Sequence, residues 1–141
     1  MGLRPTYQTI DHTGDIGIIV RAATLPALFE AAALALFDIL VDPDTVRAES
    51  PQPVEVSGEG REELMVRWLA ELLFLFDARR VVFGRFEVEE IHPDLLRARA
   101  WGEPFDEDRH VVRTELKAVT YHGLLVSEDR DGWSARIIFD V

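Results

Sequence analysis

The sequence predicts a single α+β domain over residues 1–141, a three-layer β-α-β sandwich in which two apolar helices lie between sheets. First, two long segments have helical spacing but almost no polar face, so each must be covered on more than one side. Second, the strand-like runs do not alternate regularly with helices, which favours mixed or largely antiparallel strands. Third, 141 residues with 48% hydrophobic content suit one ordinary globular core.

The first helix is predicted over residues 25–40. Thr24 precedes it as an N-cap, and Pro26 is tolerated in its first turn. Asp42-Pro43 ends it, because a residue before proline is disfavoured in helical conformation. Its interior is apolar on nearly every side. The apolar positions are Leu28, Phe29, Ala31, Ala32, Leu34, Ala35, Leu36, Phe37 and Ile39.

The second helix is predicted from Arg61 to about Asp77. Glu62 and Glu63 lie in its first turn, where the helix dipole favours negative charge. The segment 64–76 is again too apolar for a helix with one wet face. Both helices therefore belong to the middle layer.

The strands are predicted from apolar alternation and turn residues, with the first two meeting at the Thr13-Gly14 turn. The polar segment Glu103–Arg113 is predicted to be a loop, with His110 and Glu115 at its edges on the surface. The predicted strands are Tyr7–His12, Asp15–Ala22, Pro53–Gly58, Val81–Ile91, Leu95–Trp101, Leu116–Ser127 and Trp133–Phe139.

Composition limits the classes of partner. A formal net charge of −11 makes the chain a poor candidate for binding nucleic acid directly, because that affinity comes mostly from cations. The surface is expected to be simply solvated or to dock on a basic protein. There is no cysteine for a disulfide or a thiolate site, no apolar run long enough for a membrane span and no signal pattern. We expect a cytoplasmic protein without membrane partners.

Three short stretches carry most of the chemistry: Asp11–Ile18, Glu115–His122 and Phe139–Val141. Each places polar groups at the edge of a strand-like run, which is a rigid support. Asp140 and the α-carboxylate expected at Val141 are neighbours, and Asp15 is a possible third oxygen source. Such a set suits a hard divalent cation. Two plainer explanations stay open, a turn-capping role for Asp15 and an ordinary chain end for Asp140.

Lys117 is the only lysine, whereas 14 of the 15 basic residues are arginine. An ammonium is a compact point charge that a planar guanidinium does not replace where the fit is tight. Lys117 is therefore the leading candidate for a contact with a partner or for neutralising nearby carboxylates. Chance survival of one lysine is the alternative.

Several motifs, taken together and in order, resemble the archease family over the whole chain. Any one of them is weak, but their order from the first strand to the last residue is specific. Gly14 departs from the family's usual alanine without removing a candidate ligand. The motifs are Asp11-His12-Thr13-Gly14-Asp15-Ile16-Gly17-Ile18, Leu28-Phe29-Glu30-Ala31-Ala32, Ala35-Leu36-Phe37-Asp38, Trp68-Leu69-Ala70-Glu71-Leu72-Leu73, Gly102-Glu103, Lys117-Ala118-Val119-Thr120-Tyr121-His122 and Phe139-Asp140-Val141.

The resemblance implies an accessory protein with no catalytic residues of its own. Archeases activate the RtcB-type RNA ligase of tRNA splicing and RNA repair. They promote guanylylation of the ligase and its multiple turnover, and they can broaden the nucleotide that it accepts. By position, the family's divalent-metal ligands correspond to Asp15, Asp140 and Val141, with calcium the expected ion and magnesium or manganese as alternatives.

Four further residues are expected to support the metal site or to contact the partner: Lys117, His12, Asp11 and His122. An imidazole ligand is less expected in a carboxylate-rich site, because hard cations prefer oxygen. Two rival functions remain, a chaperone for another RNA-processing enzyme such as a tRNA methyltransferase and, less favoured, a metal-dependent hydrolase.

Overall fold

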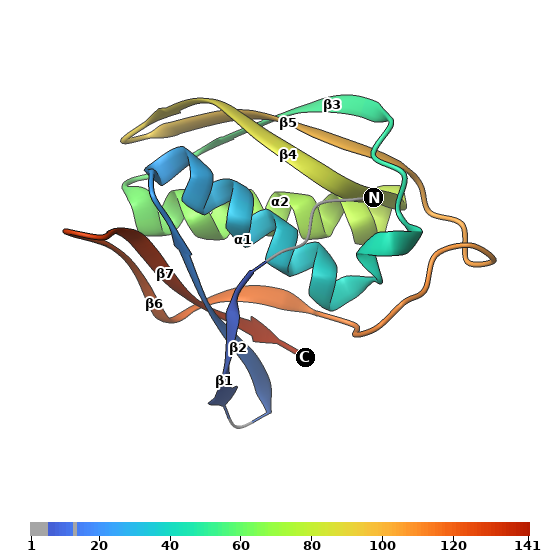
Figure 1. Ribbon diagram of the computed structural model, residues 1–141, viewed down its shortest axis with the longest axis horizontal. Helices are drawn as coiled ribbons and strands as arrows, with labels where there is room; N and C mark the ends of the chain where they lie inside the picture. The colour runs from blue at the N-terminus through green and yellow to red at the C-terminus, as the bar shows by residue number, and fades with distance from the viewer. Residues whose placement is uncertain (1–5, 13) are drawn as a thin grey trace.

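Two β-sheets enclose a layer of helices in the computed structural model of the chain, which describes residues 6–12 and 14–141 (Figure 1). One sheet has the strand order β1-β2-β7-β6 and the other the order β3-β5-β4. Every strand pair among the described residues is antiparallel. The elements are β1 (Gln8–His12), β2 (Asp15–Ala22), α1 (Leu25–Leu40), the 3-10 helix η1 (Pro43–Thr45), β3 (Ser50–Ser57), α2 (Arg61–Arg79), β4 (Val81–His92), β5 (Leu95–Pro104), β6 (Ala118–Asp129) and β7 (Gly132–Asp140).

The helix layer contacts both sheets, as Figure 1 shows. Helix α1 packs against β2 and β7 on one side and β4 on the other, while α2 packs against β6 on one side and β3, β4 and β5 on the other. The buried indole N–H of Trp68 in α2 donates to the carbonyl of Phe29 in α1, with an N–O distance of 3.0 Å. The predicted three-layer α+β architecture is confirmed, because helices without a full polar face need cover from two sheets.

The predicted helix boundaries hold closely at α1. The Thr24 hydroxyl accepts from the Ala27 N–H at 3.2 Å, and the helix ends at Leu40 before η1 begins at Pro43. Helix α2 runs two residues beyond the predicted end, to Arg79. Part of α2 does face solvent, since Phe74 is 49% exposed. No helix within the described residues is long and apolar enough to span a membrane.

Strand boundaries differ most where tertiary position overrides local preference. Strand β3 begins at Ser50, three residues before the predicted start, although it contains Pro51 and Pro53. Proline is tolerated there because β3 is an edge strand. Strand β5 continues to Pro104, so Glu103 lies in a strand and not in the predicted loop.

The ends of β1 and β6 are also corrected. Strand β1 begins at Gln8, one residue after the predicted Tyr7. Strand β6 begins at Ala118 and ends at Asp129, two residues later than predicted at both ends. Of the predicted Thr13-Gly14 turn, Thr13 lies outside the described residues, while Gly14 has a φ of 73°, which glycine adopts readily.

Gly17 makes room for the Ile10 side chain of β1 on the outer face of the four-stranded sheet. Ile10 of β1 and Ile138 of β7 are the two cross-strand partners of Gly17. A Cβ at Gly17 would lie 2.4 Å from Cγ1 of Ile10, so only glycine admits that side chain. Ile138 is fully buried as a result, although it points away from the helices. This small apolar cluster fixes the hairpin that carries Asp15.

Candidate functional site

The register of the four-stranded sheet places Asp15 and Asp140 directly opposite each other. Asp15 is the first residue of β2, and Asp140 is the last residue of β7. Direct partners in an antiparallel pair lie on the same face, with Cβ atoms about 5 Å apart. Both residues are half-buried. Two residues that are 125 positions apart in the sequence therefore present carboxylates at one end of the sheet, where β2 begins and β7 ends. We call this end of the sheet the carboxylate edge.

Lys117 and Val141 lie at the same edge. The backbone N–H of Lys117 donates to the carbonyl of Asp140 at 2.8 Å, and Ala118 is the β6 partner of Asp140. Lys117 is exposed, and Val141 is 43% exposed. In Figure 1 the C-terminal end lies beside the β1–β2 hairpin, in agreement with this register. Four of the predicted site residues thus converge.

Asp11 and His12 occupy neighbouring register positions on β1. His12 is opposite Asp15, and Asp11 is opposite Ile16. The register therefore brings the backbone of both residues next to the start of β2. The side chains of Asp11 and His12 lie outside the described part of the structure.

His122 does not lie in the row of Asp15 and Asp140. It is exposed, in a part of β6 where the pairing with β7 is interrupted between Thr120 and Leu125. Its backbone N–H donates to the hydroxyl of Thr120 at 3.3 Å. The structure therefore places His122 in the irregular part of β6, outside the directly paired positions of Asp15 and Asp140.

The donors at this edge fit a hard cation better than a soft one. They are carboxylates, and two like charges directly opposite each other in a sheet are destabilising unless something neutralises them. Within the described residues, no group of three or more His, Cys, Asp or Glu side chains is arranged to hold a metal. The side-chain pair therefore needs a further oxygen donor to become a metal site.

A cavity of about 430 Å³ adjoins the carboxylate edge, with Asp15 and Asp38 among its lining residues. The Asp38 carboxylate accepts from the Tyr7 hydroxyl at 2.6 Å and from the Arg113 guanidinium at 2.9 Å. Burial, followed by this hydrogen bond, raises the pKa of Tyr7. The contacts fasten the segment before β1 and the segment before Lys117 to the end of α1, which keeps both sides of the edge in place.

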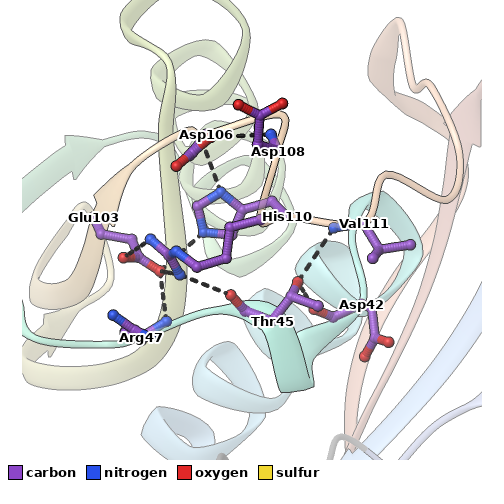
Figure 2. A network of polar contacts seen from close by, with 9 residues as sticks. Asp42, Thr45, Arg47, Glu103, Asp106, Asp108, His110 and Val111 are labelled. Carbon is purple, nitrogen blue, oxygen red and sulfur yellow. Dashed lines mark hydrogen bonds and ion pairs between the residues drawn. The ribbon is translucent and has the colours of Figure 1, made fainter.

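A second polar cluster surrounds Glu103 at the end of β5 (Figure 2). The Glu103 carboxylate accepts from the Arg109 guanidinium in a two-pronged contact, from the backbone N–H of Arg47 at 2.6 Å and from Nε2 of His110 at 2.9 Å. The Arg109 hydrogen bonds are the main reason that the pKa of Glu103 is lowered to about 2. These contacts tie the loop after β5 to η1.

His110 is buried, so its predicted surface position is wrong. Its Nδ1 accepts from the Asp106 N–H at 2.9 Å, which leaves the proton on Nε2 for donation to Glu103. The ring also stacks on Phe105, with centroids 5.5 Å apart. A polar loop that folds back over its own histidine cannot be recognised from composition. The Gly102-Glu103 motif was the sequence signal that could have pointed to this buried cluster.

Gly102 explains the other half of that motif. A Cβ at Gly102 would lie 2.0 Å from the carbonyl oxygen of Val82 in β4, so the close approach of the strands excludes any larger residue. The close strand packing therefore also fixes Glu103, the next residue on β5, opposite Val82 of β4. The motif is therefore structural, and it does not belong to the carboxylate edge.

Comparisons with known proteins agree with this fold and this set of motifs. The sequence profile of the archease protein family matches residues 7–141. The chain is 40% identical over 139 residues to the protein archease of Pyrococcus furiosus, with 96% of this chain and 98% of that protein covered.

Solved structures give the same result. The solution structure of Methanobacterium thermoautotrophicum protein 1598 is similar with a TM-score of 0.82 and 36% identity, covering 96% of this chain and 98% of that one. The crystal structure of a Thermotoga maritima protein described as an archease and possible chaperone shares the fold, with a TM-score of 0.63, 18% identity and coverage of 99% and 100%. The chain belongs to the archease family.

Proposed function

We propose that this protein is a non-catalytic accessory factor that activates an RtcB-type RNA ligase in tRNA splicing or RNA repair. It would promote guanylylation of the ligase and its multiple turnover, and would broaden the nucleotides that the ligase accepts. Family membership supports an accessory role, and one structural observation carries the proposal further. That observation is the convergence of Asp15, Asp140, Lys117 and Val141 at one sheet edge.

Asp15 and Asp140 would hold a divalent ion, preferably calcium, with magnesium or manganese as alternatives. In a chain that ends at Val141, the α-carboxylate of that residue would be the third donor. An all-oxygen donor set of this kind suits a hard cation, whose charge neutralises anionic oxygens. The direct cross-strand pairing of the two aspartates supports the assignment, since a cation between them would remove their mutual repulsion.

Lys117 would present its ammonium beside the ion site, toward the ligase or its nucleotide. Its backbone is fixed by the hydrogen bond to Asp140, while its side chain is exposed. Within the described residues it forms no ion pair. The ammonium is therefore available to an anionic group of a partner. The net charge of −11 favours a protein partner over direct contact with RNA.

The direct test is guanylylation of a purified cognate ligase with and without this protein. The unmodified protein should accelerate the reaction and permit several turnovers, and Asp15→Ala should abolish both effects. Glu107→Gln, which removes an exposed acidic charge elsewhere, should activate normally. Ligation or GTP hydrolysis by this protein alone, unaffected by Asp15→Ala, would contradict a non-catalytic role.

Metal binding can be tested at the chain end. A peptide extension after Val141 converts the α-carboxylate to an uncharged amide, so calcium affinity measured by calorimetry should fall. The same extension before Met1 is the control and should leave the affinity unchanged. Equal affinity in both proteins would remove Val141 from the ligand set.

A chaperone for another RNA-processing enzyme, such as a tRNA methyltransferase, is a second candidate. The description of the Thermotoga maritima relative as a possible chaperone favours it. This candidate predicts suppression of client aggregation that does not require Asp15 or a divalent ion. Protection of a heated methyltransferase by Asp15→Ala, together with no effect on the ligase, would select it.

A further inference from the structure

Strand β6 carries an insertion beside the carboxylate edge. Thr120 pairs with Ile138 and Leu125 pairs with Arg136, so the register advances by five residues along β6 and by only two along β7. Four residues of β6 (121–124) therefore stand between the two paired positions where β7 has one, Ile137, so β6 contains three additional residues. We call this segment, residues 121–123, the β6 bulge. A bulge is an established device for redirecting side chains near a functional site.

The β6 bulge has a defined internal structure. The Thr120 hydroxyl donates to the carbonyl of Ile138 at 3.0 Å and accepts from the N–H of His122 at 3.3 Å. Gly123 has a φ of 62°, which residues with a Cβ rarely adopt. Val119 and Leu124 pack against the core on either side of the bulge. The core contacts of β6 are thus preserved, and the additional residues lie outside them.

The β6 bulge presents apolar groups to solvent near the proposed ion site. Tyr121 is 59% exposed and Leu125 is 54% exposed. The bulge leaves the sheet at Thr120, whose partner Ile138 is two residues from Asp140, a distance of about 7 Å along the strand. Val141, at 43% exposure, lies at the same end of the sheet. The β6 bulge therefore begins close to the carboxylate edge.

Arg136 adds a cation to this surface. It is exposed, it is the β7 partner of Leu125, and within the described residues it forms no ion pair. Tyrosine and arginine are enriched at the centres of protein–protein interfaces, whereas nucleic-acid surfaces need many cations. A chain with a net charge of −11 and a single arginine at this position is suited to a protein partner.

We propose that Tyr121, Leu125 and Arg136 form a docking surface for the ligase, which receives Tyr121 in an apolar recess bordered by a carboxylate. The inference rests on the proposed function and names the surface by which the carboxylate edge is held against the ligase. Docking by the bulge accounts for the Thr120-Tyr121-His122 part of the Lys117–His122 motif, which the ion site leaves unexplained.

The test measures ligase affinity, guanylylation and calcium affinity for Tyr121→Ala and Gly123→Ala. Tyr121→Ala removes the anchor, and Gly123→Ala reshapes the bulge without deleting a side chain, because its φ is unfavourable for alanine. Each should weaken ligase binding at least tenfold and leave calcium affinity unchanged. Phe74→Ala on α2, where the exposed fraction is 49%, is the matched control and should bind like the unmodified protein.

Each other result counts against the inference. Normal ligase affinity in both bulge variants, with the unmodified protein active, overturns the docking surface and leaves the proposed function in place. An unmodified protein that neither binds nor activates the ligase overturns both. Loss of single-stranded RNA binding by Tyr121→Ala, with ligase affinity retained, assigns the surface to RNA and also overturns the proposal. A fall in calcium affinity would mean that the bulge acts through the ion site.

Discussion

Two acidic clusters of this molecule have opposite surroundings. Around Glu103 the negative charge is matched within the protein by the Arg109 guanidinium, His110 and a backbone N–H, and the cluster is largely buried. At the sheet edge the register sets Asp15 against Asp140, both half-buried, with an exposed Lys117 beside them. The first cluster pairs its carboxylate with cationic and N–H groups of the protein, whereas the second sets two carboxylates in direct register.

The difference separates a structural cluster from a functional candidate. Matched charges and filled hydrogen bonds stabilise one loop conformation, so the Glu103 cluster should contribute to folding. Two carboxylates placed directly opposite each other have a geometry that a divalent ion can bridge, so the sheet edge should contribute to ion binding. Substitutions at the two places should therefore affect different properties.

The largest effect is expected at the sheet edge. Asp15→Asn combined with Asp140→Asn should weaken calcium binding at least 100-fold, about 2.7 kcal/mol, because both proposed carboxylate ligands are lost. The unfolding temperature in excess chelator should change little, since asparagine keeps the size and shape of aspartate. Calorimetric titration and thermal unfolding measure the two quantities. Asp94→Asn with Glu107→Gln carries the same charge change at exposed positions and is the control. Unaltered calcium affinity would contradict the comparison.

A smaller effect, on stability alone, is expected at the buried cluster. Glu103→Gln leaves Arg109 and His110 without their anionic partner, which should lower the free energy of unfolding by about 2 kcal/mol. Calcium affinity should be unaffected. Urea denaturation in excess chelator provides the measurement, with the exposed Glu107→Gln of the same loop as control. A loss of calcium affinity without a loss of stability would reverse the roles of the two clusters.

The same cluster predicts a pH dependence. The pKa of Glu103 is lowered from 4.5 to about 2, so the unfolded chain takes up the proton first as the pH falls. The stabilisation is fully present above about pH 4.5 and is lost as the pH falls toward 2. The difference in unfolding free energy between the unmodified protein and Glu103→Gln should therefore shrink across this window. A constant difference, measured by urea denaturation at each pH, would show that ionised Glu103 is not responsible.

The smallest effect on stability is expected for Lys117→Arg. An exposed substitution that keeps the charge should change the free energy of unfolding by less than about 0.5 kcal/mol. Activation of the ligase should nevertheless fall several-fold, because a guanidinium is wider and directs its hydrogen bonds differently. Guanylylation rates together with urea denaturation separate the two properties. Full activation by the variant would make Lys117 an ordinary surface charge.

Local sequence signals predicted a large part of this structure correctly. Thr24 and Asp42-Pro43 mark the ends of α1, because capping and proline geometry act within a few residues. Predictions were weakest where a strand's position in the sheet decides the outcome. Pro51 and Pro53 argue against a strand in isolation, yet an edge position tolerates them.

The sequence by itself determined the two apolar helices, the three layers that they require and the ordered motifs of the archease family. Each of these follows from residues close together in the chain or from their order. Only the tertiary structure decided that Asp15 faces Asp140, that His110 is buried against Glu103 and that residues 121–123 leave the sheet. Periodicity reports which side of a strand is buried but not which residue lies opposite. Cross-strand register is set by packing between segments far apart in the sequence.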